Sequence, residues 1–379
     1  MIKNIKLLLA HPENCITAFI FMGLAIAFGA FITRLPDIKD ALSLSEADLG
    51  TALFFLPLGA ATLLPFYSKI ISRFGERSTT AFAICVLFVV MLLPGLAPNL
   101  YWLMASLYVV GLAMGLTDVA MNAEAAEIEQ AKARIIMSSC HGFFSLGGMI
   151  GALLGSLFIA IGVGLVLQMA MIGVVLLLFL APKFRDMINA QAHEVSKGFQ
   201  LPPLKVWVYA IIGLCVMMGE GGITDWSTIL LRDDMGVSAA YAGFGFAGFS
   251  LLMALGRFNG DQLQRKFGGR FLVIMGFLIG VVGLGLTLTA MPIVVIIGFS
   301  LAGLGYSVIV PILYSASAKI DGVRSSSGIA SVASAGYVGM LIGPVLIGFI
   351  AEAWGLSSGF VFLLCLTAIG FLLALKTFR

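Results

Sequence analysis

Long apolar segments are the feature that most restricts how this 379-residue chain can fold. A helix needs about 20 consecutive apolar residues to cross the hydrocarbon core of a bilayer. Twelve such stretches follow one another, at 14–40, 46–68, 78–97, 100–126, 135–160, 162–181, 205–231, 240–262, 270–290, 292–317, 326–350 and 357–376. Lipid offers no hydrogen bonds to open backbone, and these runs are too continuous for alternating barrel strands, so we expect twelve transmembrane helices.

The composition excludes the main alternatives to a membrane protein. Charged residues make up 11% of the chain and hydrophobic residues 60%. Soluble domains carry about 25% charged residues, so a soluble enzyme is excluded. Disorder is excluded as well, because disordered chains lack apolar residues. The predicted fold class is an all-α polytopic membrane protein embedded in a lipid bilayer.

The basic residues predict the orientation of the helices. The chain has 22 Lys and Arg residues. All of them except Arg34, Lys39 and Arg232 are assigned to the termini or to loops on one side of the twelve-helix topology. Arg257 is counted there with the loop after the eighth segment. Because positive residues accumulate on the cytoplasmic side, both termini are expected to be cytoplasmic. The net charge of +3 is then explained by the basic residues on the cytoplasmic side and does not indicate a nucleic-acid partner.

The chain contains an internal repeat. A polar stretch at 182–204 separates a first half, 1–181, from a second half, 205–379. An offset of 193 aligns Ser45 with Ser238, Gly50 with Gly243, Arg73 with Lys266, Phe74 with Phe267, Gly75 with Gly268 and Arg77 with Arg270. An offset of 192 aligns Gly147 with Gly339 and Gly151 with Gly343. Repeated halves predict two pseudo-symmetric six-helix bundles joined by a linker, the architecture of alternating-access transporters.

Two basic loops carry a family resemblance. The sequence SKIISRFGER ends at Arg77, and GDQLQRKFGGR begins at Gly260. Both resemble the loop pattern Gly-x-x-x-Asp-Arg-x-Gly-Arg of the major facilitator superfamily, although Ser68 and Ser72 replace Gly and Asp in the first copy and the second copy is one residue longer. The resemblance implies a gating role for Arg73, Gly75, Arg77, Gly260, Asp261 and Arg265, with which Arg257 is grouped.

A more specific resemblance involves the fourth segment. The sequence GLTDVAMNAEAAEIE from Gly115 is similar to the fourth helix of the fucose-permease-like sugar/proton symporters, which implies proton coupling at Asp118 beside Asn122. TRLPDIKDALSLS, CHGFFSLGG, GEGGITDW, GRFNGD and GYVGMLIGP resemble the YbjJ-type bacterial members of this group. The implied location is the bacterial inner membrane.

Charged and polar residues inside the spans are the candidate site residues, because a charge at mid-membrane costs about 2.5–3.5 kcal/mol or more. Asp118 lies deep in the fourth segment, and Asn122 shares its helix face. Asp118 is predicted to bind protons; the alternative is a structural hydrogen bond to a neighbouring helix. His141, about 10 Å into the fifth segment, is either a proton relay with Ser145 as partner or a packing residue.

Glu220 in the seventh segment is the second candidate for proton coupling, with Thr224 on its face and Trp226 near the outer end. Arg34, at the outer end of the first segment, is expected to pair with Glu220 or Asp225, either as an outer gate or in solute binding. The alternatives are that Arg34 extends to the interface and that Asp225 caps a helix end.

Three tyrosines, Tyr306, Tyr314 and Tyr337, are candidate solute contacts or interhelical packing residues. The sequence contains no nucleotide-binding loop, no metal-type Cys/His cluster and no Ser/His/Asp nucleophile arrangement. We therefore expect no enzymatic activity, no cofactor and no metal.

These features together predict a monomeric secondary transporter that imports a small polar solute, a sugar or sugar derivative, by proton symport. Proton-coupled export of an amphipathic compound is the alternative, suggested by the glycine-rich GGMIGALLGS from Gly147. A non-transporting sensor on the same fold is a third possibility.

Overall fold

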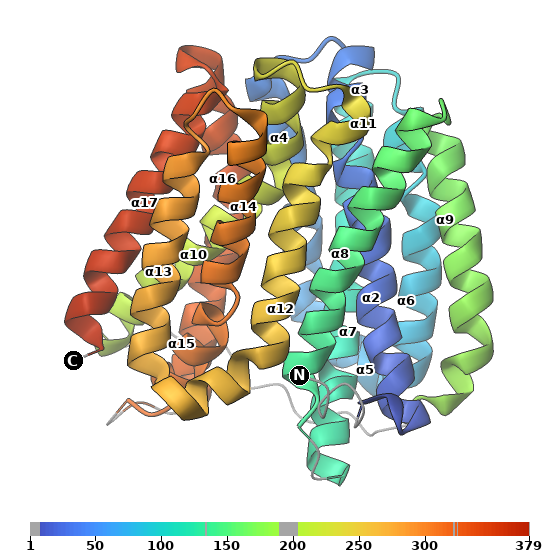
Figure 1. Ribbon diagram of the computed structural model, residues 1–379. Helices are drawn as coiled ribbons and strands as arrows, with labels where there is room; N and C mark the ends of the chain where they lie inside the picture. Colours follow the sequence, from blue (N-terminus) through green and yellow to red (C-terminus); the bar gives the residue numbers. More distant parts are fainter. Residues whose placement is uncertain (1–7, 133–134, 189–203, 321–322, 324, 379) are drawn as a thin grey trace.

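The computed structural model describes residues 8–132, 135–188, 204–320, 323 and 325–378, and every regular element in this part of the chain is helical (Figure 1). The first half contains α2 (Pro12–Ile32), α3 (Leu35–Ala41), α4 (Glu46–Leu63), η1 (Leu64–Phe66), α5 (Tyr67–Phe74), α6 (Glu76–Val90), η2 (Leu93–Leu96), α7 (Leu100–Lys132), α8 (Met137–Ala160), α9 (Leu165–Leu180) and η3 (Ala181–Asp186). The second half contains α10 (Leu204–Ile229), η4 (Leu230–Asp234), α11 (Ala239–Ala242), α12 (Phe244–Phe267), α13 (Gly269–Leu286), α14 (Pro292–Tyr306), α15 (Ile309–Ser317), α16 (Ser325–Trp354) and α17 (Leu356–Thr377).

The predicted transmembrane helices are present. Within the described residues, 11 helical segments are long and apolar enough to cross a membrane. The remaining predicted span is α4, which has 18 residues, carries Glu46 and Asp48 in its first turn, and packs between α7 and α16. The all-α, multi-span fold class is confirmed.

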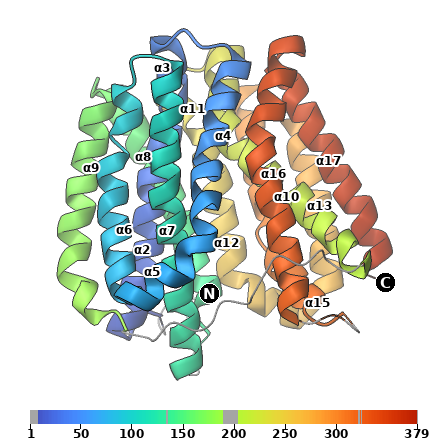
Figure 2. The same ribbon diagram turned by 180° about the vertical axis from the view of Figure 1, so that it is seen from behind.

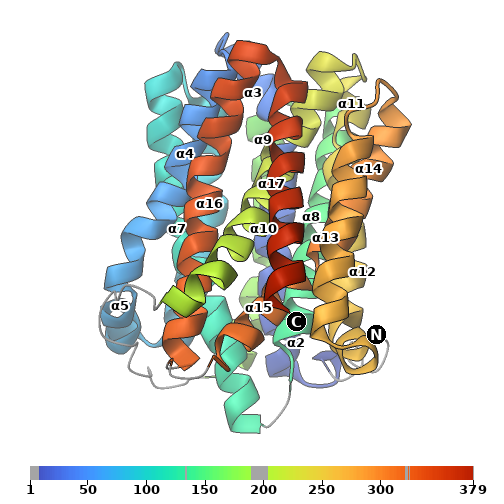
Figure 3. The same cartoon turned by 90° about the vertical axis from the view of Figure 1, so that its left-hand side faces the viewer.

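The helices form two bundles with matching internal packing (Figures 1 and 2). In the first bundle α2 packs on α8 and α4 on α7, and in the second α10 packs on α16 and α12 on α14. The bundles meet along two further helix pairs, α8 with α12 and α4 with α16. The second of these pairs is visible in Figure 3. The interface between the bundles is therefore lined by equivalent helices from each half.

The backbone repeats at the offset that the sequence predicts. The described residues with positive φ form three pairs, each 193 residues apart: Ser43 with Gly236, Gly75 with Gly268, and Gly162 with Gly355. Gly75 and Gly268 both have φ of 78° and both join the end of one helix to the start of the next. L side chains rarely adopt this conformation, so glycine occupies both copies of the sharp turn.

The two ends of the molecule differ in what they contain. The first residues of α2 and the last residues of α17 lie at one end, which we call the terminal face, whereas α3 and α11 lie at the opposite end, the distal face (Figures 1 and 3). Most of the predicted linker 182–204 lies outside the described residues, since these stop at 188 and resume at 204.

Candidate functional site

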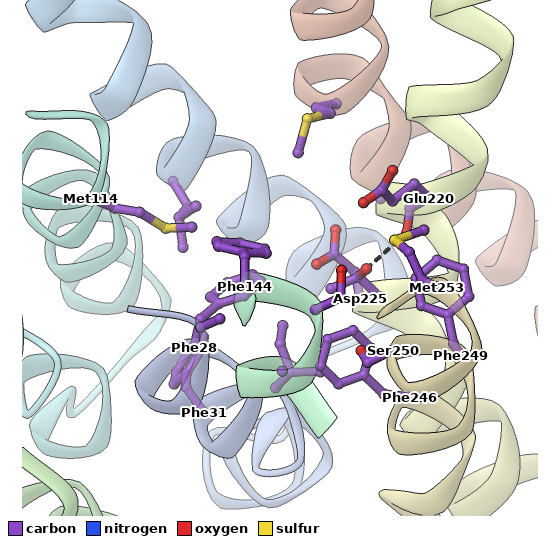
Figure 4. A pocket seen from close by; sticks show the side chains of 18 of the residues that line it. Phe28, Phe31, Met114, Phe144, Glu220, Asp225, Phe246, Phe249, Ser250 and Met253 are labelled. Atoms are coloured by element: carbon purple, nitrogen blue, oxygen red, sulfur yellow. Dashed lines mark hydrogen bonds between the residues drawn. The ribbon is translucent and has the colours of Figure 1, made fainter. Parts of the chain in front are cut away.

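A cavity lies between the two bundles, and its empty space, together with the solvent at its opening, is about 920 Å³ (Figure 4). Its wall is largely apolar and includes five phenylalanines and three methionines: Phe28, Phe31, Phe144, Phe246, Phe249, Met114, Met253 and Met340. A largely apolar wall with a few polar groups is typical of small-molecule sites. The cavity therefore has the character of a binding site for a small solute.

An ion pair between α10 and α12 borders the cavity. Arg257 Nη2 lies 3.3 Å from Glu220 Oε1, and Arg257 Nη1 donates a 2.8 Å hydrogen bond to Ser145 Oγ. Glu220 and Arg257 belong to the second bundle, whereas Ser145 on α8 belongs to the first. The structure thus brings together two predicted site residues, Glu220 and Ser145, through an arginine that connects the bundles.

The assignment of Arg257 to a loop is wrong. The residue lies inside α12, and the helix continues for ten residues beyond it, to Phe267. Arg257 lies near the end of an apolar run, where the sequence gives no sign that the helix continues. The polar residues that follow it are nevertheless helical as far as Phe267. Arg257 is therefore a cavity residue, which the sequence assignment missed.

Asp225 and Thr224 also line the cavity, one turn or so beyond Glu220 on α10. Thr224 Oγ1 donates to the Glu220 carbonyl at 2.8 Å. Among the described residues, the Asp225 carboxylate has neither a hydrogen-bond partner nor an ion-pair partner. Figure 4 shows Glu220 and Asp225 on one side of the cavity, across from Phe28, Phe31 and Phe144.

A second carboxylate site lies between α7 and α16. Asn122 Nδ2 donates to the Asp118 carbonyl at 2.8 Å and to Asp118 Oδ1 at 3.3 Å. The Tyr337 hydroxyl donates to Asp118 Oδ2 at 3.4 Å from the other bundle. The shared face of Asp118 and Asn122 is confirmed, and Tyr337 adds a contact across the interface.

Arg34 does not pair with Glu220 or Asp225, so that expectation is wrong. Its Nε donates to Gln168 Oε1 at 2.7 Å, its Nη1 pairs with Asp37 Oδ2 at 2.8 Å, and its Nη2 donates to the Val163 carbonyl. Arg34 sits where the chain turns from α2 into α3, and its side chain points towards α9 of its own bundle. Its bonds stabilise the first bundle internally.

The distal face is closed by a charge network that sequence reasoning missed. Arg232 Nη1 pairs with Asp37 Oδ1 at 2.8 Å, and Arg232 Nη2 also pairs with Asp40. Lys39 Nζ lies 2.9 Å from Asp233 Oδ2. We call these five residues the distal charge network. Arg232 and Asp233 belong to the π-helical turn η4 of the second bundle and the other three to α3 of the first, so the pairs hold the bundles together.

Lys39 also lies 2.7 Å from Glu46 Oε1. Burial by itself lowers the pKa of Lys39, but hydrogen bonds to Glu46 and Asp233 and the charges of both outweigh it and raise the pKa above its usual value. The lysine is therefore charged throughout the physiological pH range and keeps its ion pairs with Glu46 and Asp233 there.

The remaining predicted site residues lie apart from the cavity. The His141 ring packs edge-on against Phe21 with centroids 5.2 Å apart. Trp226 and Tyr306 are buried outside the cavity wall, and the Tyr306 hydroxyl is 2.7 Å from Thr367 Oγ1. Because Thr367 donates its own proton to the Leu363 carbonyl, Tyr306 is the donor. This geometry favours packing for Tyr306.

The loop-motif residues lie at the terminal face. Arg73, Gly75 and Arg77 surround the turn between α5 and α6, and Gly260, Asp261 and Arg265 lie in the last part of α12. Both segments are at the end where α17 finishes (Figure 1). Their gating role stays a prediction.

The fold and the cavity define a multi-span membrane protein of the transporter class, and comparison with known proteins identifies the family. The profile of the Major Facilitator Superfamily matches residues 17–320 and also residues 209–379. An uncharacterised MFS-type transporter of Yersinia pestis is 34% identical over 92% of both chains. Membrane protein MosC of Rhizobium meliloti is 30% identical over 93% of this chain and 87% of its own. The chain belongs to the major facilitator superfamily.

Solved structures agree on the fold. A bacterial homologue of the human lysosomal transporter Spinster, in an inward-facing and occupied conformation, matches with a TM-score of 0.73 and 16% identity over 96% of both chains. A mutant of the nucleoside transporter NupG matches with a TM-score of 0.76 and 8% identity over 97% of this chain and 100% of its own. Identities this low show the fold alone. Relatives in this family are transporters, so the chain is a transporter rather than an enzyme.

Proposed function

We propose that this transporter imports a small polar solute, a sugar or sugar derivative, by proton symport across the bacterial inner membrane, with the terminal face in the cytoplasm. The observation that carries the proposal is Asp118, a carboxylate within a membrane span that contacts Asn122 of its own bundle and Tyr337 of the other. Protons and one small solute are the proposed cargo, and the unit is a monomer.

The contacts of Asp118 suit a group that gains and loses a proton. Both hydrogen bonds to its carboxylate are long, at 3.3 and 3.4 Å, and both come from neutral groups. A charge within the membrane without a cationic partner is costly, and protonation removes that cost. Since the Tyr337 bond crosses the interface, the charge on Asp118 bears directly on how the bundles meet.

The cavity supports a hydroxylated solute. Phenylalanine rings stack on the apolar faces of sugar rings, and Glu220, Thr224 and Ser250 offer polar atoms for hydroxyl groups. The resemblance of the fourth helix to the fucose-permease-like symporters, and of other segments to YbjJ-type members, also favours this solute class.

Proton-coupled export of an amphipathic compound is the second candidate. It is favoured by the largely apolar cavity wall with its five phenylalanines and three methionines. Drug sensitivity of a deletion strain separates the two, because loss of an exporter sensitises cells and loss of an importer does not.

The test is uptake of labelled sugars into proteoliposomes under an imposed pH gradient. We expect Asp118→Asn to reduce gradient-driven accumulation by about tenfold or more, whereas solute exchange at equal pH continues, because only the proton step is lost. Asp186→Asn, at the terminal face outside the cavity, is the matched control. Undiminished accumulation by Asp118→Asn would refute proton coupling at this residue.

A further inference from the structure

The charges that line the cavity do not balance. Among the described lining residues, two carboxylates, Glu220 and Asp225, face a single cation, Arg257. Arg257 pairs with Glu220 at 3.3 Å. Asp225 is left as one carboxylate in excess, without a cationic partner, on the wall of a largely apolar cavity.

The chain supplies no other cation to Asp225 in its described part. Arg257 already uses Nη2 for Glu220 and Nη1 for Ser145. Arg34, which the sequence suggested as a partner, bonds to Gln168, Asp37 and Val163 instead. Arg232 is held by Asp37 and Asp40. Each nearby arginine is therefore committed elsewhere.

The surroundings of Asp225 favour a cation from outside the chain. The same cavity wall presents five phenylalanine rings, and the faces of such rings attract ammonium groups. A carboxylate removed from bulk water is stabilised when a cation pairs with it. Thr224 and Ser250 offer further hydroxyl groups in the same wall. Aromatic faces around one unpaired carboxylate form a site for an organic ammonium ion.

We propose that the solute carries a protonated nitrogen, which pairs with Asp225 inside the aromatic cavity while its hydroxyl groups bind near Glu220 and Arg257. The solute class is a small hydroxylated amine, such as an amino sugar. This inference rests on the proposed function, since it names the solute of the same cavity.

Matched pairs of probes test the inference on the purified full-length transporter. Glucosamine is compared with glucose and N-acetylglucosamine, and tyramine with its alcohol tyrosol, at about pH 7, where primary amines are mainly protonated. Binding is measured by thermal shift and by intrinsic fluorescence. We expect each amine to bind about tenfold or more tightly than its neutral counterpart, as a charge-assisted contact provides.

Asp225→Asn is expected to abolish the preference for amines, and Asp186→Asn, which removes the same charge far from the cavity, is expected to keep it. Equal binding of amine and neutral probe by the unmodified protein overturns the inference, as does failure of both amines to bind, and both readings are independent of how the variant folds. Gradient-driven uptake of a neutral sugar without any amine preference overturns the inference but leaves the proposed function intact. If the unmodified protein binds amines preferentially but shows no uptake driven by a pH gradient, the symport proposal is rejected and the inference about Asp225 stands.

Discussion

The two ends of the interface between the bundles are held by different forces. At the distal face, charged side chains pair across the interface, Arg232 with Asp37 and Asp40 and Lys39 with Asp233. Towards the terminal face, the hydrogen bonds across the interface that the described residues make have at least one neutral partner, as in Tyr337 with Asp118 and Arg257 with Ser145, and the rings of Phe143 and Phe258 pack there as well. In the described part of the chain, ion pairs across the interface therefore belong to the distal face, whereas hydrogen bonds and apolar packing join the rest.

Backbone packing strengthens the same difference. Gly50 on α4 and Gly348 on α16 bring the two helices together near the distal face, where a side chain on Gly50 would meet the Pro344 carbonyl oxygen at 2.5 Å. Opening the distal face has to separate charges and closely packed backbones together. The closed distal face is therefore the stable part of this conformation, and four predictions test it.

The largest effect is expected for Gly50→Val. The new side chain would lie within 3.1 Å of the Gly348 Cα as well, so α4 and α16 can no longer close together at the distal face. We expect solute flux to fall by about tenfold or more, equivalent to about 1.4 kcal/mol or more. A cysteine placed at Ser250 in the cavity, in a background without the native cysteines, should react faster with an impermeant thiol reagent added at the distal face.

The matched control is Gly285→Val, because nothing lies within 4 Å of a Cβ built on that helical glycine. Normal flux and normal labelling in Gly50→Val would show that close backbone packing is unnecessary for distal closure.

A smaller effect is expected for Arg232→Ala, which removes the two ion pairs that this side chain makes with the first bundle. Partly exposed ion pairs contribute about 0.2–1 kcal/mol each, so the fraction of molecules whose distal face is open should rise several-fold. The same thiol labelling measures it.

Salt gives an independent measurement of the distal charge network. The screening length falls from about 10 Å at 0.1 M to about 3 Å at 1 M, so salt should increase labelling of the unmodified protein and change Arg232→Ala less. Arg185→Ala removes an exposed arginine at the terminal face and is the control. If neither salt nor Arg232→Ala changes the rate of thiol labelling, the role of the distal charge network is contradicted.

The smallest effect is expected for Tyr337→Phe. It removes one hydrogen bond of 3.4 Å and keeps the ring, so flux should change by less than about threefold, with unchanged distal labelling. An effect on labelling as large as that of Arg232→Ala would reverse the comparison between the two parts of the interface.

Features fixed by local spacing could be predicted from the sequence. Asp118 and Asn122 are four residues apart on one helix, and their side chains do meet, because helix geometry alone determines that. The internal repeat can be predicted for the same reason, because Gly75 and Gly268 occupy the same turn in each half. Helix positions and depth along each helix follow from the apolar runs.

Contacts between distant helices could not be predicted in the same way. Membrane helices that are apolar on every side give no indication of which face meets which neighbour. The sequence suggests Glu220 as a partner for Arg34, yet the Arg34 side chain bonds to Gln168, which is 134 residues away in sequence. Trp226 follows directly after Asp225, but only Asp225 faces the cavity. Rotation about the helix axis decides these outcomes.

Arg257 divides its bonds unequally, and this has a consequence for the rate of the transport cycle. Its charged partner Glu220 belongs to the same bundle, so the ion pair is kept when the bundles separate, whereas the hydrogen bonds to Ser145 and from Ser138 to the Arg257 carbonyl break. The bond to Ser145 has a charged donor, and such a bond contributes about 1.5–3 kcal/mol, which adds about a tenfold to hundredfold delay to an activation barrier. Keeping the ion pair within one bundle thereby avoids the larger cost of separating two opposite charges inside the membrane.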